Sequence, residues 1–159
     1  MKGHDRVIEL LNEALRNELT AVNQYWLHYR LFDHWGIHRL AEFERHESID
    51  EMKHADRLSE RILFFNGLPN FQMLGRLRIG ENVEEALRAD LALEYEALEQ
   101  LKGAIAHCEA VRDYVSRDLF AEILANEEEH VDTLERQFDM IGNMGLANYI
   151  QIQSKPAEE

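Results

Sequence analysis

Apolar residues recur at steps of three and four along most of the chain, which is the spacing that places them on one face of an α-helix. The first such run covers residues 7–33 and ends before Gly36. A second run covers residues 37–65 and stops at the sequence NGLP, residues 66–69, where Gly and then Pro end a helix. The apolar face of the first predicted helix is made by Ile8, Leu11, Leu15, Leu19, Val22, Trp26 and Tyr29.

The middle of the chain predicts a long connection followed by a third helix. Pro69, Gly75 and Gly80 interrupt residues 67–81, so we expect an extended crossover there in place of a further long helix. Such a crossover would make the helices before and after it parallel. Asn82 followed by Glu85 resembles a capping box, and the helix that begins there continues to a break near Val111.

The last part of the chain predicts a fourth long helix and a short terminal one. Asp113 or Ser116 can cap the fourth helix, and we expect Gly142 and Gly145 to close it. Residues 146–152 are predicted to add a short helix. The pattern therefore predicts an all-α fold, a four-helix bundle with one long crossover and a short C-terminal fifth helix.

Each predicted apolar face carries ionisable residues at positions where core residues belong. A buried carboxylate without a partner costs several kcal/mol or shifts its pKa, so four of them together require cations. One such residue would be unremarkable in an acidic helical protein, but six on four faces are not expected from chance. They are Glu18, Glu51, His54, Glu94, Glu127 and His130.

The spacing of these six residues repeats. Glu18 to Glu51 and Glu94 to Glu127 are both 33 residues, and the two Glu-x-x-His units lie 76 residues apart. A Glu from each of two helices and a Glu-x-x-His from each of the other two is the ligand set of di-iron carboxylate bundles. Two Fe(II) ions would balance the charge of four glutamates. Oxygen-rich ligands with two imidazoles suit iron or manganese better than thiolate-seeking metals.

The pseudo-two-fold arrangement assigns roles to the ligands. We expect Glu51 and Glu127 to bridge two irons that dioxygen or hydrogen peroxide then oxidises. The expected terminal ligands are Glu18 with His54 on one iron, and Glu94 with His130 on the other.

For other side chains near the expected site, the sequence gives less evidence of a role than it gives for the six predicted ligands. Glu47, one turn before Glu51, is a candidate acceptor that orients an imidazole. Tyr25 lies two turns after Glu18, where its phenol could hydrogen-bond a ligand or give an electron; a buried tyrosine with a satisfied hydroxyl is the equal alternative. Cys108 falls on an apolar face and is expected in the core. The histidines at positions 4, 28, 34, 38 and 107 have no matching partner spacing.

Length and charge narrow the class of protein. The 159 residues suit one domain, residues 1–159, with a substantial core. With 17 Lys and Arg against 31 Asp and Glu, the formal charge of −14 disfavours nucleic acid and anionic membranes as partners and favours cations. No stretch approaches the ~20 apolar residues of a membrane span, and the N-terminus is unlike a signal peptide, so we expect a cytoplasmic protein.

Several segments together resemble bacterioferritin along nearly the whole chain. They include HESIDEMKHADR (residues 46–57), NELTAVNQYW, LRIGENVEEALRADLALE and ILANEEEHVDTLE. The resemblance implies a ferritin-like fold, ferroxidase activity and iron storage inside a 24-subunit shell (24-mer) built from two-fold dimers. It also implies haem b, one per two subunits with Met52 of each as axial ligand, and a small ferredoxin for iron release. Met52 follows Glu51 by about 100° on its helix, which turns it away from the bundle interior.

The resemblance implies one further role and leaves two rival functions to weigh. His46 and Asp50 resemble inner-surface iron ligands, with a solvated His and Asp as the alternative reading. A di-iron oxygenase would need a substrate pocket and usually a larger chain. A mini-ferritin that protects DNA would place its metal site between subunits, and so would not need all six ligands in one chain.

Overall fold

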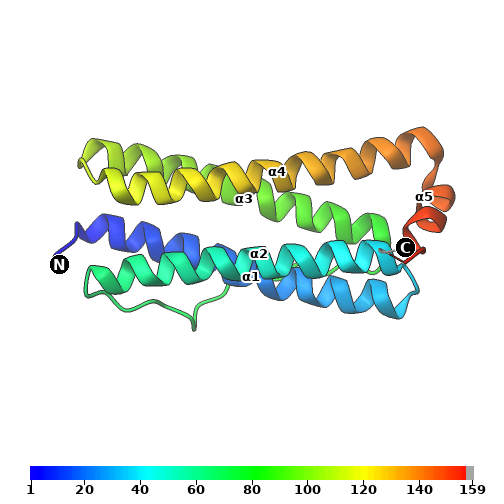
Figure 1. Ribbon diagram of the computed structural model, residues 1–159, viewed down its shortest axis with the longest axis horizontal. Coiled ribbons are helices and arrows are strands. Elements are labelled where there is room, and N and C mark those ends of the chain that lie inside the picture. The colour runs from blue at the N-terminus through cyan, green and yellow to red at the C-terminus, as the bar shows by residue number, and fades with distance from the viewer. Residues whose placement is uncertain (157–159) are drawn as a thin grey trace.

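Five helices make up the part of the chain that the structure, a computed structural model, describes, namely residues 1–156 (Figure 1). They are α1 (Asp5–His34), α2 (His38–Phe64), α3 (Val83–Ala110), α4 (Tyr114–Met144) and α5 (Leu146–Gln153). Residues 1–156 contain no strand, so the predicted all-α class is confirmed. None of these five helices is long and apolar enough to cross a membrane.

The four long helices form two hairpins joined by the predicted crossover. α1 packs against α2, and α3 packs against α4, with α1 also contacting α3. In Figure 1, α2 and α3 run in the same direction, because the chain between Phe64 and Val83 returns along the bundle before α3 begins. The observed topology is the predicted four-helix bundle with one long crossover.

Side-chain caps fix the starts of α3 and α4. The Asn82 side chain accepts from the backbone N–H of Glu85 at 2.9 Å, and the Glu85 carboxylate accepts from the N–H of Glu81 at 3.0 Å. Asp113, and not Ser116, caps α4 by accepting from the N–H of Ser116 at 3.0 Å. Both helices therefore begin where short polar side chains satisfy free backbone donors.

Two details of the predicted helices were wrong. Gly142 does not end α4, which continues through it to Met144 and stops at Gly145, whose φ of +83° only glycine adopts without strain. Trp26 is not on the buried face of α1, because it follows the buried Tyr25 by about 100° and is 43% exposed. The guanidinium of Arg45 lies over its ring instead.

The crossover is held to α1 by a ladder of polar side chains. Residues four apart on α1 accept backbone N–H groups from three crossover residues, which satisfies donors that have no helix or sheet partner. The pairs are Thr20 with Gly75 at 2.8 Å, Gln24 with Arg78 at 3.0 Å, and His28 with Gly80 at 3.0 Å.

The apolar core is divided along the bundle axis. One cluster, which includes Leu15, Leu58 and Phe120, fills the end near the N-terminus, and it contains Cys108 as predicted. Another, which includes Leu40 and Leu134, fills the opposite end, where Tyr149 of α5 packs. The six predicted ligands are buried in the same bundle interior as these clusters.

Candidate metal centre

All six predicted ligands are buried, none more than 7% exposed, and each of the four long helices contributes at least one. α1 carries Glu18, and α3 carries Glu94. The Glu-x-x-His units lie on α2 and α4, where the three-residue step puts both side chains on one face. The residues whose spacing repeats in the sequence therefore meet in one interior.

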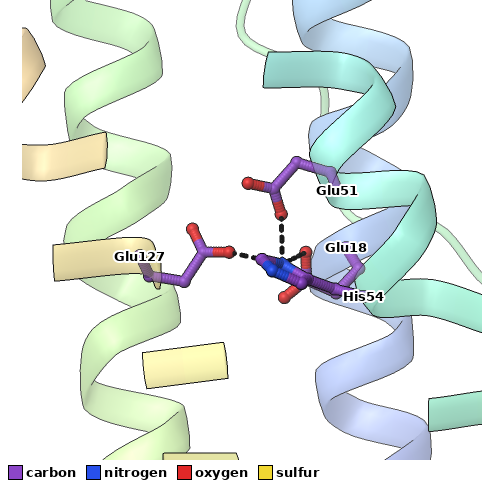
Figure 2. Close-up of side chains that lie close together, drawn as sticks. All are labelled: Glu18, Glu51, His54 and Glu127. Carbon is purple, nitrogen blue, oxygen red and sulfur yellow. Dashed lines mark ion pairs between the residues drawn. The ribbon is translucent and has the colours of Figure 1, made fainter. Parts of the chain in front are cut away.

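One half of the centre is built around His54. Its Nδ1 lies 2.9 Å from Oε1 of Glu127, 3.5 Å from Oε2 of Glu18 and 3.6 Å from Oε2 of Glu51. Figure 2 shows these three carboxylates pointing at the same imidazole from different helices. One nitrogen and three carboxylates within 4.8 Å of one another make a group that could hold a metal ion.

The other half is built in the same way around His130. Its Nδ1 lies 2.9 Å from Oε1 of Glu51, 3.4 Å from Oε2 of Glu127 and 3.7 Å from Oε1 of Glu94. Glu51 and Glu127 thus turn one oxygen toward each histidine, whereas Glu94 faces His130 alone. Glu51 and Glu127 are the two carboxylates predicted to bridge, and Glu94 is one of the two predicted to be terminal.

Many oxygen and nitrogen atoms of the six residues point into the centre without making a hydrogen bond. Within residues 1–156, both carboxylate oxygens of Glu127 and the Nδ1 atoms of His54 and His130 are buried and make ion-pair contacts with one another but no aligned hydrogen bond. One carboxylate oxygen of each of the other three glutamates is also buried without a hydrogen bond, namely Oε1 of Glu51, Oε2 of Glu18 and Oε2 of Glu94. Buried polar atoms are normally hydrogen-bonded, so this concentration of lone pairs without aligned hydrogen bonds fits a pair of divalent cations as ligands.

Without metal, protons carry the positive charge of the centre. Burial raises the pKa of Glu18 well above its ordinary range, and the charges of Glu51 and Glu127 add to the shift. Burial likewise raises the pKa of Glu94. Burial lowers the pKa of each imidazole, but the surrounding carboxylates outweigh it and raise the pKa of His54 and of His130. Four metal-facing groups therefore hold protons that two divalent cations could replace without changing the net charge.

The outer nitrogens of the two histidines meet different partners. Nε2 of His54 is hydrogen-bonded at 3.1 Å to Oδ1 of Asn126, a residue that the sequence did not single out. Nε2 of His130 lies 2.8 Å from Oε2 of Glu47, in the orienting position predicted for that carboxylate. On the terminal ligand Glu94, the Tyr25 hydroxyl donates a hydrogen bond of 2.5 Å. Tyr25 is thus both fully buried and in contact with a predicted ligand.

The remaining predicted residues lie outside the buried centre. His46 is exposed, and its Nε2 lies 3.7 Å from Oδ2 of Asp50, which is itself 3.8 Å from Nε2 of His130. Met52 is 45% exposed and so is turned away from the bundle interior, as its position after Glu51 predicts.

A second buried polar cluster was missed by sequence reasoning. His28, Glu44 and Asp90 are fully buried and come from α1, α2 and α3. Nε2 of His28 accepts from the N–H of Gly80, so its Nδ1 carries the hydrogen that it donates to Oδ1 of Asp90 at 2.9 Å. Gln24 donates to the same oxygen at 2.9 Å. Both ring nitrogens of His28 are used, so its hydrogen bonds join α1, α3 and the crossover and leave no lone pair on the imidazole for a metal.

Glu44→Gln is expected to stabilise the protein at neutral pH. Burial and the charge of Asp90 raise the pKa of Glu44 well above its ordinary value. At pH values between the pKa of Glu44 in the unfolded state and its higher pKa in the folded state, only the folded protein keeps the Glu44 proton. The free energy of unfolding of the wild type therefore falls by about 1.4 kcal/mol for each pH unit of increase in this range. A glutamine cannot ionise and can still donate to Asp90.

Melting curves at pH 4.5 and 7.5 test this expectation. The variant should melt with the wild type near pH 4.5 and above it at pH 7.5. Glu42→Gln, on the exposed face of the same helix, is the control, whose shift should not grow with pH. A variant that melts below the wild type at both pH values would contradict the proton assignment.

Four helices that direct four glutamates and two histidines into one buried centre define the class of di-iron carboxylate bundles. Comparison with known proteins agrees, since the family described as Ferritin-like domain matches residues 8–144. The chain belongs to the ferritin-like family, and within it to the bacterioferritins.

Three relatives named Bacterioferritin illustrate the extent of the similarity. The one from Brucella melitensis is 54% identical over 159 residues, covering 100% of this chain and 99% of its own. That from Mycolicibacterium paratuberculosis is 47% identical, covering 98% of this chain and 99% of its own. That from Rhodobacter capsulatus is 46% identical, covering 99% of this chain and 98% of its own. The likeness thus extends over the helices and the crossover alike.

Proposed function

We propose that the protein is an iron-storage ferroxidase that oxidises Fe(II) at the six-residue centre. The observation that carries this proposal is the set of buried, unpartnered donor atoms that converge from four helices within residues 1–156. The membership of the chain in the bacterioferritins supports iron as the metal and storage as the purpose.

The chain's own groups would perform distinct parts of the reaction. Glu51 and Glu127 face both histidines and would hold two Fe(II) ions close together, while Glu18 and Glu94 would each complete one position. Two Fe(II) ions lose two electrons, which with two protons reduce dioxygen to hydrogen peroxide, or peroxide to water. Protons displaced from the ligands when iron binds are available for that reduction. The buried walls would exclude bulk water and competing ligands.

The two rival functions fit the structure less well. A mini-ferritin centre is shared between subunits, whereas here both ligand groups are complete within one chain. An organic substrate of an oxygenase would need a cavity beside the metals. The pocket of about 730 Å³ along α1 lies instead between Ile8, Arg16 and the crossover residues 68–73.

Assembly and the haem belong to the same proposal. We infer a 24-subunit cytoplasmic shell built from two-fold dimers, with Fe(II) and dioxygen or hydrogen peroxide as substrates and a small ferredoxin as electron donor for iron release. Met52 fits a haem b ligand because its thioether is exposed on α2, where a two-fold partner could present a second sulfur. The haem would supply one-electron transfer toward the stored iron. His46 and Asp50 are proposed as inner-surface iron ligands.

Zn(II), which has no redox chemistry with dioxygen, or Co(II) under anaerobic conditions, is expected to raise the melting temperature of the metal-free protein and to displace protons. The folded state alone presents the centre, so binding stabilises it by about 2.7 kcal/mol per site at a 100-fold excess over Kd. Up to about four protons should leave per two ions at pH 7, from Glu18, Glu94, His54 and His130.

Calorimetric titration in two buffers of different ionisation enthalpy counts these protons. Glu127→Ala serves as the matched variant, in which both effects should be strongly reduced. A wild-type protein with neither a rise in melting temperature nor proton release would refute the metal centre.

A further inference from the structure

The two halves of the centre have the same ligands but different surroundings. Each half offers one terminal glutamate, one imidazole Nδ1 and the same two bridging carboxylates. Any difference in affinity between the two iron positions must therefore come from groups that contact the ligands. The most direct such contacts are at the outer nitrogens of His54 and His130.

These contacts favour a hydrogen on Nε2 in both rings, through a hydrogen bond at His54 and through the charge of a carboxylate at His130. Nε2 of His54 faces the amide oxygen of Asn126 at 3.1 Å, and an oxygen acceptor there requires the hydrogen to sit on Nε2. Nε2 of His130 faces the carboxylate of Glu47 at 2.8 Å, with Asp50 at 3.8 Å. Each Nδ1 is thereby left with a lone pair for a metal when its proton is displaced.

The partners differ in charge and in burial. Glu47 is 6% exposed, whereas Asn126 lies on the exposed side of α4. The contact of Glu47 is an ion pair, since its Oε2 has no aligned donor in residues 1–156, so its effect is that of a negative charge in a poorly solvated place. An exposed neutral amide exerts no comparable field.

The repeat that relates the ligands breaks at these partners. The residue 76 positions after Asp50 is Asn126, and the residue 76 positions after Glu47 is Ile123. α2 therefore supplies carboxylates to the histidine of α4, but α4 returns only an amide to the histidine of α2. Tyr25, which hydrogen-bonds Glu94, likewise has the apolar Leu101 as its counterpart.

We propose that Glu47 and Asn126 are positioning residues that set the affinities of the two iron positions separately, with the Glu47 carboxylate making His130 the stronger imidazole donor. A negative charge beside Nε2–H increases the electron density at Nδ1 and so strengthens its bond to a cation. The inference rests on the proposed metal centre, because it assumes that the two histidines bind metal.

Anaerobic Co(II) titration of the metal-free protein tests the proposal. Glu47→Gln keeps the size and an acceptor oxygen but removes the charge, so Co(II) affinity at the Glu94–His130 position should fall by about 10- to 100-fold. Asn126→Asp should raise the affinity at the Glu18–His54 position by a smaller factor, about 3-fold, because water screens an exposed carboxylate. Each variant should leave the other position within about 2-fold of wild type. Anomalous scattering from crystals at substoichiometric Co(II) identifies which position is occupied.

Glu99→Gln, which removes an exposed charge from α3, is the matched control and should change neither affinity. The proposal is overturned if Glu47→Gln weakens both positions equally or neither, or if Asn126→Asp leaves the His54 position unchanged. Because Asn126 is exposed, its variant keeps the test valid even if the buried Glu47 variant is poorly folded. Absence of Co(II) from both positions of the wild type would instead refute the proposed function.

Discussion

Glu127→Ala is expected to slow Fe(II) oxidation by more than about 100-fold while the protein remains folded and assembled. Partners that only orient a metal ligand typically contribute 10- to 100-fold, and Glu127 faces both histidines with its two oxygens. Its removal would leave each metal position with only one shared carboxylate, Glu51. The empty centre would also lose a source of carboxylate repulsion, so the melting temperature of the metal-free variant should not fall sharply.

Stopped-flow absorbance after mixing anaerobic Fe(II) protein with dioxygen measures the rate, and light scattering measures the assembly. His130→Ala should behave in the same way, because its Nδ1 is the nitrogen of the second position. Glu122→Ala, one turn and a half before Glu127 on the exposed side of α4, is the control and should oxidise iron at the normal rate. A wild-type rate in Glu127→Ala would show that Fe(II) oxidation does not need the Glu127 carboxylate as a bridge.

Met52→Leu is expected to abolish haem binding while Fe(II) oxidation and assembly continue. Met52 is 45% exposed on α2, whereas Glu51 beside it is 1% exposed, so the helix turns these adjacent residues in different directions. Leucine keeps a similar apolar volume but has no sulfur to ligate iron. Both axial ligands of a haem on the two-fold axis would be lost at once.

The measurements are the haem absorbance per subunit, the particle size, and the rates of iron uptake and reductive release. Release should slow, because electrons lose their relay toward the stored iron. Met73→Leu, at another exposed methionine on the crossover, should keep its haem. Haem retained in Met52→Leu with a bis-thioether spectrum would exclude Met52 as the ligand, and lost uptake in an intact shell would show that the two sites are coupled.

The residues that meet in the buried centre could be predicted from the sequence because a helix converts linear spacing into a shared face. Glu51 with His54, and Glu127 with His130, are three residues apart, and within a helix that step leaves little choice of direction. The same regularity places Met52 away from Glu51. The starts of α3 and α4 were predictable for a local reason too, since Asn82 and Asp113 cap backbone groups only three residues away.

Relations between helices were decided only by the tertiary structure. His28 and Asp90 are 62 residues apart, and their hydrogen bond depends on the axial shift and rotation of α1 against α3, which no local spacing encodes. Trp26 had the spacing of a core residue, but the width of the buried face of α1 leaves it outside.

The difference between Glu47 and Asn126 has the same origin. Glu47 and Asn126 each touch a histidine of another helix. The sequence repeat relates the six residues of the centre to one another, but the packing of α2 against α4 decides which side chain meets the outer nitrogen of each ring. The sequence by itself therefore determined which residues face the interior. The structure determined which of them touch, because contact requires the relative placement of elements that the chain joins only through distant turns.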